Sequence, residues 1–366
     1  NVMHRILEET RIFAVWPEQR WDIDGAAVDV SLVCFGEHPD PSAYLNDLPV
    51  TEIHADLTAG LNMTLAKPLT ENVGVAMLGI QKSGPFDVSG PLAREWMAQP
   101  ANPNAQANSA ILKPYWNGDD VTARPRDMWL IDLPLNLTEA AAAQYEAPFQ
   151  HIASTPDEDG KMVRELREEL GDRAHERWWE PHWPRPEMRQ KIEKLSRYIV
   201  TPETAQYRVF SWLSYPTLPD KNLIVIARDD DLIFGLLQSR FHESWSLRKG
   251  SDLQDRPRYT HTSTFATFPF PDGMTPDLPV ETALAAPGAK AIAAAARELD
   301  RLRMAWLWPE GSWYEESEGV ATLPTRRVPV DQAAADLLKR RTMTTLYKNR
   351  PEWLVLAHQA LDGAVA

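Results

Sequence analysis

The pattern of apolar and polar positions predicts the structure most clearly between residues 222 and 271. A short apolar run, residues 223–227, is rich in β-branched side chains and predicts a buried strand. The acidic turn 228–231 comes next, and a second apolar run covers residues 232–237. We interpret the two runs as a hairpin that leads into a helix, whose partly polar face carries Gln238, Arg240, His242 and Glu243.

A polar, arginine-rich stretch, residues 248–258, interrupts this apolar scaffold and precedes the sequence Thr-Phe-Ala-Thr-Phe-Pro-Phe-Pro. The hydrophobic segments on either side hold the stretch at both ends. A loop dense in Arg, Lys, Gln and Asp, presented in this way, predicts contact with a polar ligand.

The rest of the chain predicts an α+β fold. The pattern near the N-terminus predicts a helix at 2–9 and strands at 11–15 and 26–35. Residues 67–151 hold short strands separated by Gly and Pro, and charges at helical spacing follow in 161–198. We therefore expect a sliver of α/β sheet, a β-rich middle and C-terminal helices, the last at 289–308, 331–347 and 351–366.

Composition is that of a globular chain of 366 residues and 41.4 kDa, with 43% hydrophobic and 25% charged residues. The single cysteine, Cys34, excludes an internal disulfide framework and disfavours a cysteine zinc site. The sequence has no apolar run of membrane-spanning length and no signal peptide, so we expect an intracellular, cytoplasmic setting. The net charge of −14 argues mildly against nucleic-acid binding, although a local basic surface on an acidic body can still bind phosphate.

The 14 Trp and 30 Pro residues are numerous for this length. Tryptophans fill hydrophobic cores, but they also form stacking surfaces for sugars or bases, and both readings stay open at this point.

Motifs for a self-sufficient active site are not found. A nucleotide-binding glycine loop, a P-loop and a nucleophile elbow are all missing from the sequence. His175 and His182 lack the spacing of two ligands on one helix face. Asp157, Asp159 and Lys161 crowd into one loop, which is unlike a nuclease site, and we interpret Asp229, Asp230 and Asp231 as a solvated turn. Because the chain begins without Met and stops inside a helical pattern, we expect a fragment of a longer protein.

Seven collinear segments resemble the C-terminal part of the MmeI-like (type IIL) restriction-modification enzymes, with their N6-adenine DNA methyltransferases. The segments are 11–35, 69–90, 111–133, 197–213, 234–245, 257–271 and 346–365. The resemblance implies a remnant of the methyltransferase sheet at 1–66, a DNA target recognition domain at 67–275 and a helical region at 276–366. The family's S-adenosyl-L-methionine (AdoMet) domain, with its Asn-Pro-Pro motif, comes earlier in the chain, and this sequence contains neither motif.

The resemblance also implies site residues. An enzyme that methylates adenine N6 flips the base and holds it against an aromatic ring, and Trp16, in Val-Trp-Pro, stands where related enzymes have Val-Phe-Pro. Phe13 is the weaker choice, and the alternative for Trp16 is packing at a sheet edge. Base readout in the major groove favours Arg, Lys, Gln and Asp. The candidates are Arg240, His242, Arg248, Lys249, Asp252, Gln254, Asp255, Arg256 and Arg258. The alternative is that most of these residues are solvated or contact phosphate, and we expect only two or three of them to touch bases.

Phosphate contacts are expected from Lys113, Arg124, Arg126, Arg185, Arg189 and Arg208. The expected partners are double-stranded DNA and the methyltransferase domain of the same polypeptide, with AdoMet bound only in the full-length parent and no metal. Two alternatives remain: an aromatic-rich carbohydrate- or protein-binding module, and an autonomous enzyme.

Overall fold

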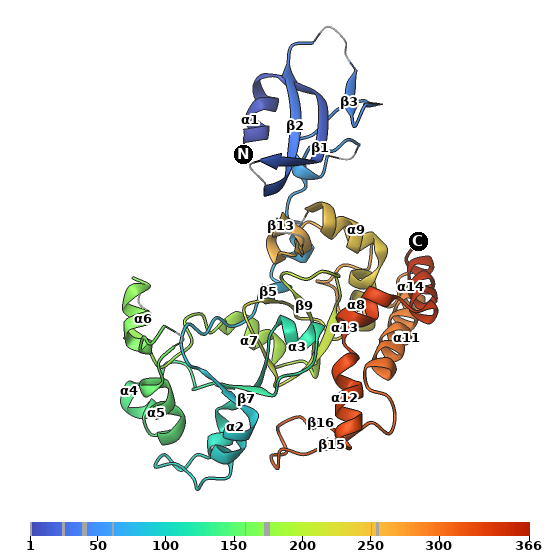
Figure 1. The fold of residues 1–366 in the computed structure, drawn as a ribbon. Helices are drawn as coiled ribbons and strands as arrows, with labels where there is room; N and C mark the ends of the chain where they lie inside the picture. The colour runs from blue at the N-terminus through green and yellow to red at the C-terminus, as the bar shows by residue number, and fades with distance from the viewer. Residues whose placement is uncertain are drawn as a thin grey trace. The chain divides into compact units, whose positions relative to one another are not determined.

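The computed structural model describes residues 2–23, 26–38, 42–60, 62–157, 159–171, 176–249, 251–253 and 256–366 (Figure 1). The chain divides into two compact units, Asn1–Lys67 and Pro68–Ala366. Both units combine helices with mostly antiparallel sheets, so the predicted α+β class is confirmed.

The first unit is a four-stranded sheet of order β2-β1-β3-β4 with one helix packed on it. Its β1 runs past the expected end at Val15, because a β-bulge between Trp16 and Gln19 absorbs Pro17 without ending the pairing with β2. The core of the unit contains Ile12 and Val15. The elements are α1 (Val2–Glu9), β1 (Arg11–Ile23), β2 (Ala26–Gly36), β3 (Ala43–Leu45), β4 (Leu48–Val50) and η1 (Met63–Leu65).

The second unit is built on two four-stranded sheets. The first, antiparallel throughout, has the order β10-β9-β12-β5 and comprises β5 (Ala76–Leu78), β9 (Arg197–Pro202), β10 (Ser211–Ser214) and β12 (Leu223–Ile226). The second has the order β11-β7-β8-β6, with β6 (Asp87–Ser89), β7 (Leu112–Trp116), β8 (Met128–Ile131) and β11 (Leu218–Pro219). Two hairpins complete the strands: β13 (Ser251–Leu253) with β14 (Arg256–Arg258), and β15 (Trp313–Glu316) with β16 (Arg326–Pro329).

Strands β9 and β12 separate two hydrophobic cores. Ile199 and Ile224 face one core, whereas Val200 and Val225 face the other. A strand buried on both faces has no polar positions to alternate with, which is why 223–227 is an uninterrupted apolar run. The buried strand predicted there is confirmed as β12.

Helices cover both sides of this sheet. The short helix η2 (Thr70–Asn72) precedes β5. Between β6 and β9 lie α2 (Gly90–Met97), η3 (Asn108–Ala110), α3 (Gly118–Thr122), α4 (Glu139–Ala142), α5 (Glu146–Ser154), α6 (Val163–Glu169) and α7 (Pro186–Ile192). After β12 come α8 (Asp231–Gln238), α9 (Arg240–Lys249), the π-helix η5 (His261–Phe265), α10 (Val280–Ala283), α11 (Ala289–Leu307), α12 (Gln332–Arg340), α13 (Met343–Asn349) and α14 (Glu352–Val365).

The second apolar run, expected to be a strand, is helix α8, so the hairpin expected between the two runs is wrong. Asp230 caps this helix by accepting a hydrogen bond from the Ile233 amide at 2.9 Å, and it is itself buried. Asp231 pairs with Arg197 and Arg297, so the expected solvated turn is also wrong. Every residue of α8 after its first is buried, and periodicity cannot distinguish such a helix from a buried strand.

The C-terminal helices α11, α13 and α14 share one hydrophobic core with α8. Helices α8 and α11 cross closely at Gly235. A Cβ added at this glycine would lie only 2.9 Å from the Ala296 Cβ. Gln238, predicted on a partly polar face, is buried and accepts a hydrogen bond from Arg303 at 2.9 Å. Figure 1 shows α11, α13 and α14, coloured orange to red, gathered beside α8.

No helix within the described ranges combines the length and the apolar character needed to cross a membrane.

Candidate nucleic-acid interface

The polar stretch 248–258 forms the end of α9 and the β13–β14 hairpin, in which Ser251 pairs with Arg258 and Leu253 with Arg256. Gln254 and Asp255 lie outside the described residues, as do the side chains of Asp252 and Arg256. The expected loop is therefore largely a two-stranded ribbon, an element that fits into a DNA major groove.

Backbone and side-chain contacts attach the return strand of the hairpin to the end of β9. The Tyr259 amide donates to the Glu203 carbonyl at 2.6 Å, and Thr204 forms a β-bridge with Arg258. The Arg258 Nε donates to Glu203 Oε1 at 2.8 Å, while the Arg258 side chain remains 49% exposed. The hairpin therefore rises from a fixed base.

Arg208, predicted to contact phosphate, braces the hairpin from inside the protein. Only 5% of the residue is exposed, and its guanidinium donates to Thr201 Oγ1 at 3.0 Å and to the Pro257 carbonyl at 2.9 Å. Burial lowers the pKa of Arg208 to about 10. The guanidinium is occupied inside the protein, so in this structure Arg208 is not exposed to a DNA phosphate.

His242, predicted to read bases, is completely buried. Its Nδ1 lies 2.9 Å from the Leu237 carbonyl, which can only accept, so Nδ1 carries the proton. The other ring nitrogen, Nε2, then accepts from the Tyr259 hydroxyl at 3.1 Å. Burial lowers the pKa of His242 to about 3, which keeps the ring neutral. This residue cannot reach a base edge and is an internal anchor of the hairpin.

The remaining described candidates lie on α9. Arg240 and Arg248 are exposed and Lys249 is partly exposed. The Arg240 guanidinium lies 5.1 Å from the ring centre of Phe241, which is itself exposed. The surface formed by α9 and the hairpin thus presents several basic side chains on a firmly held base.

Most of the other phosphate candidates already have protein partners. Arg126 pairs with Asp120 at 3.0 Å and Arg189 with Asp132 at 2.7 Å. Arg124 stacks 3.7 Å from the Trp308 ring centre, and Arg185 donates to the Gly79 carbonyl at 3.2 Å. Burial lowers the pKa of Lys113, which is partly exposed. Arg126 is the exposed member of this set.

A cavity of about 410 Å³ opens beside the base of the hairpin and was not predicted from the sequence. Asn117 and Asp119 at the start of α3 form one wall, Glu203 and Tyr207 another, and Thr344 of α13 a third. Three segments that lie more than eighty residues apart in the sequence line this cavity. A local sequence motif cannot predict contacts between such distant segments. The same holds for Glu203, whose sequence context resembles any polar turn.

In the first unit, Trp16 and Phe13 lie on β1. The Trp16 Nε1 donates to Asp47 Oδ1 at 3.1 Å, and its indole is partly exposed next to the bulge. Phe13 stacks on His38 with ring centres 4.6 Å apart. Both residues lie at irregularities in the β1–β2 pairing, Phe13 between Ile12 and Ala14 and Trp16 next to the shift that ends at Gln19.

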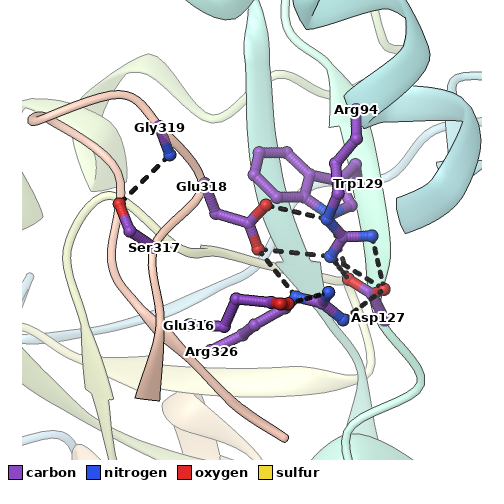
Figure 2. A network of polar contacts seen from close by, with 8 residues as sticks. All are labelled: Arg94, Asp127, Trp129, Glu316, Ser317, Glu318, Gly319 and Arg326. Carbon is purple, nitrogen blue, oxygen red and sulfur yellow. Dashed lines mark hydrogen bonds and ion pairs between the residues drawn. The ribbon is translucent and has the colours of Figure 1, made fainter.

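A second polar cluster, shown in Figure 2, is structural. Arg94 forms ion pairs with Asp127 and Glu318 at 2.8 Å each, and Arg326 pairs with Glu316. Burial acts to lower the pKa of Arg94, but the hydrogen bonds to the two carboxylates outweigh it and raise that pKa. The cluster pairs its own charges and fastens the β15–β16 hairpin to β8.

Metal chemistry finds no support in the described ranges, which contain no group of three His, Cys, Asp or Glu side chains able to hold an ion. His182 lies beside Trp183, with ring centres 5.0 Å apart, and His175 is outside the described residues.

The α9–hairpin surface lies within a segment that matches a known family model. Residues 144–272 match the family model of the MmeI target recognition domain. The predicted resemblance to the MmeI-like enzymes is confirmed for this segment, which contains β9, Glu203, α9 and the whole β13–β14 hairpin.

The fold is also that of MmeI. A solved structure of the type IIL restriction-modification enzyme MmeI in complex with DNA superimposes with a TM-score of 0.66 and 17% sequence identity. The alignment covers 98% of this chain and 43% of the MmeI chain, so these residues correspond to less than half of that enzyme. A search of curated protein sequences found no match.

Proposed function

We propose that this chain recognises a specific sequence in double-stranded DNA and directs the N6-adenine methyltransferase of a restriction-modification system to it. The observation that carries the proposal is the position of the β13–β14 hairpin inside the segment that matches the MmeI target recognition domain. The MmeI structure with the same fold was solved in complex with DNA, which supports a DNA ligand.

Base readout is assigned to the α9–hairpin surface. Arginine and lysine donate to guanine, glutamine pairs with adenine, and aspartate accepts from cytosine. The proposed readers are Arg240, Arg248, Lys249, Asp252, Gln254, Asp255, Arg256 and Arg258. A two-stranded ribbon fixed at its base reduces the ordering that binding would otherwise require.

Methyl transfer is assigned to the parent protein. AdoMet does not fit this chain, because the sequence has neither the glycine loop nor the Asn-Pro-Pro motif that its chemistry requires. We propose that another domain of the same polypeptide binds it, and that Trp16 stacks on the flipped adenine at the edge of that domain. Incubating this chain alone with AdoMet and duplex DNA is expected to give no methylated adenine, and methylation would contradict this assignment.

Salt-dependent binding tests the DNA ligand. Phosphate contacts release counterions, so the affinity for duplex DNA should fall linearly with salt on logarithmic axes. Replacing Arg126, the exposed phosphate candidate, by Ala should reduce that slope by about 1. The matched control is Arg301→Ala on α11, which removes an exposed arginine paired with Glu298 and should leave the slope unchanged.

The competing reading, a carbohydrate- or protein-binding module, predicts the opposite result. Binding to glycans that does not depend on salt, without binding to DNA, would overturn the proposed function.

A further inference from the structure

Glu203 holds one edge of the Arg258 guanidinium. Its Oε1 accepts from Nε at 2.8 Å and lies 2.7 Å from Nη2. A guanidinium is planar, so a carboxylate on the Nε–Nη2 edge leaves the Nη1–Nη2 edge directed toward other acceptors. The Arg258 side chain is half exposed, which gives an external ligand access to that edge.

The backbone of Glu203, which carries this carboxylate, is held by hydrogen bonds on both sides. Glu203 follows the buried strand β9, its amide donates to the Asn222 carbonyl at 2.7 Å, and its carbonyl accepts from Tyr259. Only 22% of the Glu203 side chain is exposed. The backbone that carries the carboxylate is therefore tied to the core sheet as well as to the end of the hairpin.

Both chain neighbours of Arg258 are fixed as well. The Pro257 carbonyl accepts from the buried Arg208, and Tyr259 is completely buried with its hydroxyl on His242. Arg258 therefore projects from an immobile backbone position, with its side chain oriented before any ligand arrives.

Guanine is the base that fits this arrangement. Its O6 and N7 lie side by side in the major groove and accept two parallel N–H bonds from one arginine edge. A side chain oriented in advance loses less rotamer freedom on binding, so its contribution to discrimination is larger.

We propose that Glu203 is a positioning residue that presents Arg258 to a guanine, which makes the pair a determinant of one base position in the recognised sequence. This inference rests on the proposed function. Glu203 lies at least 45 positions before residues 248–258, and it acts on base recognition through the Arg258 side chain.

The test is the selection of bound duplexes from a randomised pool by the intact protein, followed by sequencing. Arg258→Ala should abolish the preference for guanine at one position, a loss of about 10-fold or more. Glu203→Ala should reduce the preference at that same position by roughly fivefold and leave the other positions unchanged, because the reader remains but is no longer oriented. Glu139→Ala is the matched control, since it removes the carboxylate of an exposed arginine pair, with Arg164, on another part of the surface.

The outcomes separate the inference from the function. If the unaltered protein selects a sequence and Glu203→Ala selects it equally well, the inference is overturned and the proposed function stands. Uniform weakening at every position, or a loss of thermal stability that accompanies the change, would also overturn it by showing a structural role. If the unaltered protein selects no sequence at all, the inference falls together with the proposed function.

Discussion

His242 illustrates how a single buried residue couples the fold to pH. Burial holds its pKa at about 3 in the folded chain, against 6.5 for an unperturbed histidine. Between these values the unfolded chain binds a proton that the folded chain does not, so stability falls as the pH drops below 6.5, by up to about 1.4 kcal/mol per pH unit. We expect His242→Asn to flatten this dependence in urea unfolding between about pH 7 and about pH 5.

A second buried histidine contributes to the same pH dependence, and a control variant is needed. His358, whose pKa burial lowers to about 4, acts in the same direction and should preserve part of the slope. The control is Gln144→Asn, which changes an exposed side chain that does not titrate. An unchanged slope in His242→Asn would show that the imidazole is not the source.

Trp16 carries the second residue-scale prediction. In the intact methyltransferase, Trp16→Ala should slow methylation by about 10-fold or more while duplex binding stays nearly constant, because base–aromatic stacking contributes about 1 to 3 kcal/mol after the base has flipped. Trp21→Ala is the matched control, since Trp21 lies on the same strand and is 51% exposed. Equal losses of binding and methylation would contradict the stacking role.

Residue types in the sequence indicate the chemistry that a segment can perform, but they do not show which side chains are exposed to a ligand. The polar composition of 248–258 indicated a reading surface, and Arg248 and Arg258 are exposed. The sequence could not show that Arg208 and His242 turn inward, because a buried polar group is revealed only by the partners that satisfy it. Those partners lie on other elements of the fold.

At the scale of elements, the crossing of α8 and α11 depends on Gly235. Its missing side chain lets Ala296 and Ile292 approach, and a Cβ there would lie 2.9 Å and 3.0 Å from their side chains. Gly235→Ala should therefore lower the free energy of unfolding by about 1 to 3 kcal/mol through overpacking.

The control for that substitution is another helical glycine. Gly363 of α14 has nothing within 4 Å of an added Cβ, so Gly363→Ala should be neutral or stabilise the chain by about 0.5 to 1 kcal/mol. Chemical denaturation of both variants measures the difference. If both change stability in the same direction and by the same amount, the close crossing is not what Gly235 provides.

Elements were predictable where pattern and length agreed. The helix expected at 289–308 is α11 (Ala289–Leu307), and the one expected at 351–366 is α14 (Glu352–Val365). The helix expected at 331–347 is interrupted between α12 and α13, where Thr342 caps a new helix. Residues 232–237 were misassigned as a strand because α8 is buried on every side, and a fully apolar run of six residues carries no period.

For the whole molecule, an acidic chain binds DNA only through a local surface. The net charge of −14 repels phosphate at long range, so the DNA binding that we propose requires a local attraction, which we assign to the exposed basic residues of α9 and the hairpin. The alignment covers 43% of the MmeI chain. The division of labour that we propose, in which this chain selects the site and another domain performs the methyl transfer, stays a proposal. The three-part division at 66 and 275 stays a prediction, although the helices after 276 pack on α8 within one unit.

The most direct test of the central claim is to exchange residues 248–258 in the intact enzyme for the corresponding segment of a related protein and to map the methylated adenines by sequencing. The account predicts that the recognised sequence changes at one or a few base pairs, while the methylated adenine and the remaining positions are kept. An exchange that leaves the methylated sequence unchanged in an active, folded enzyme would contradict the assignment of base readout to this hairpin.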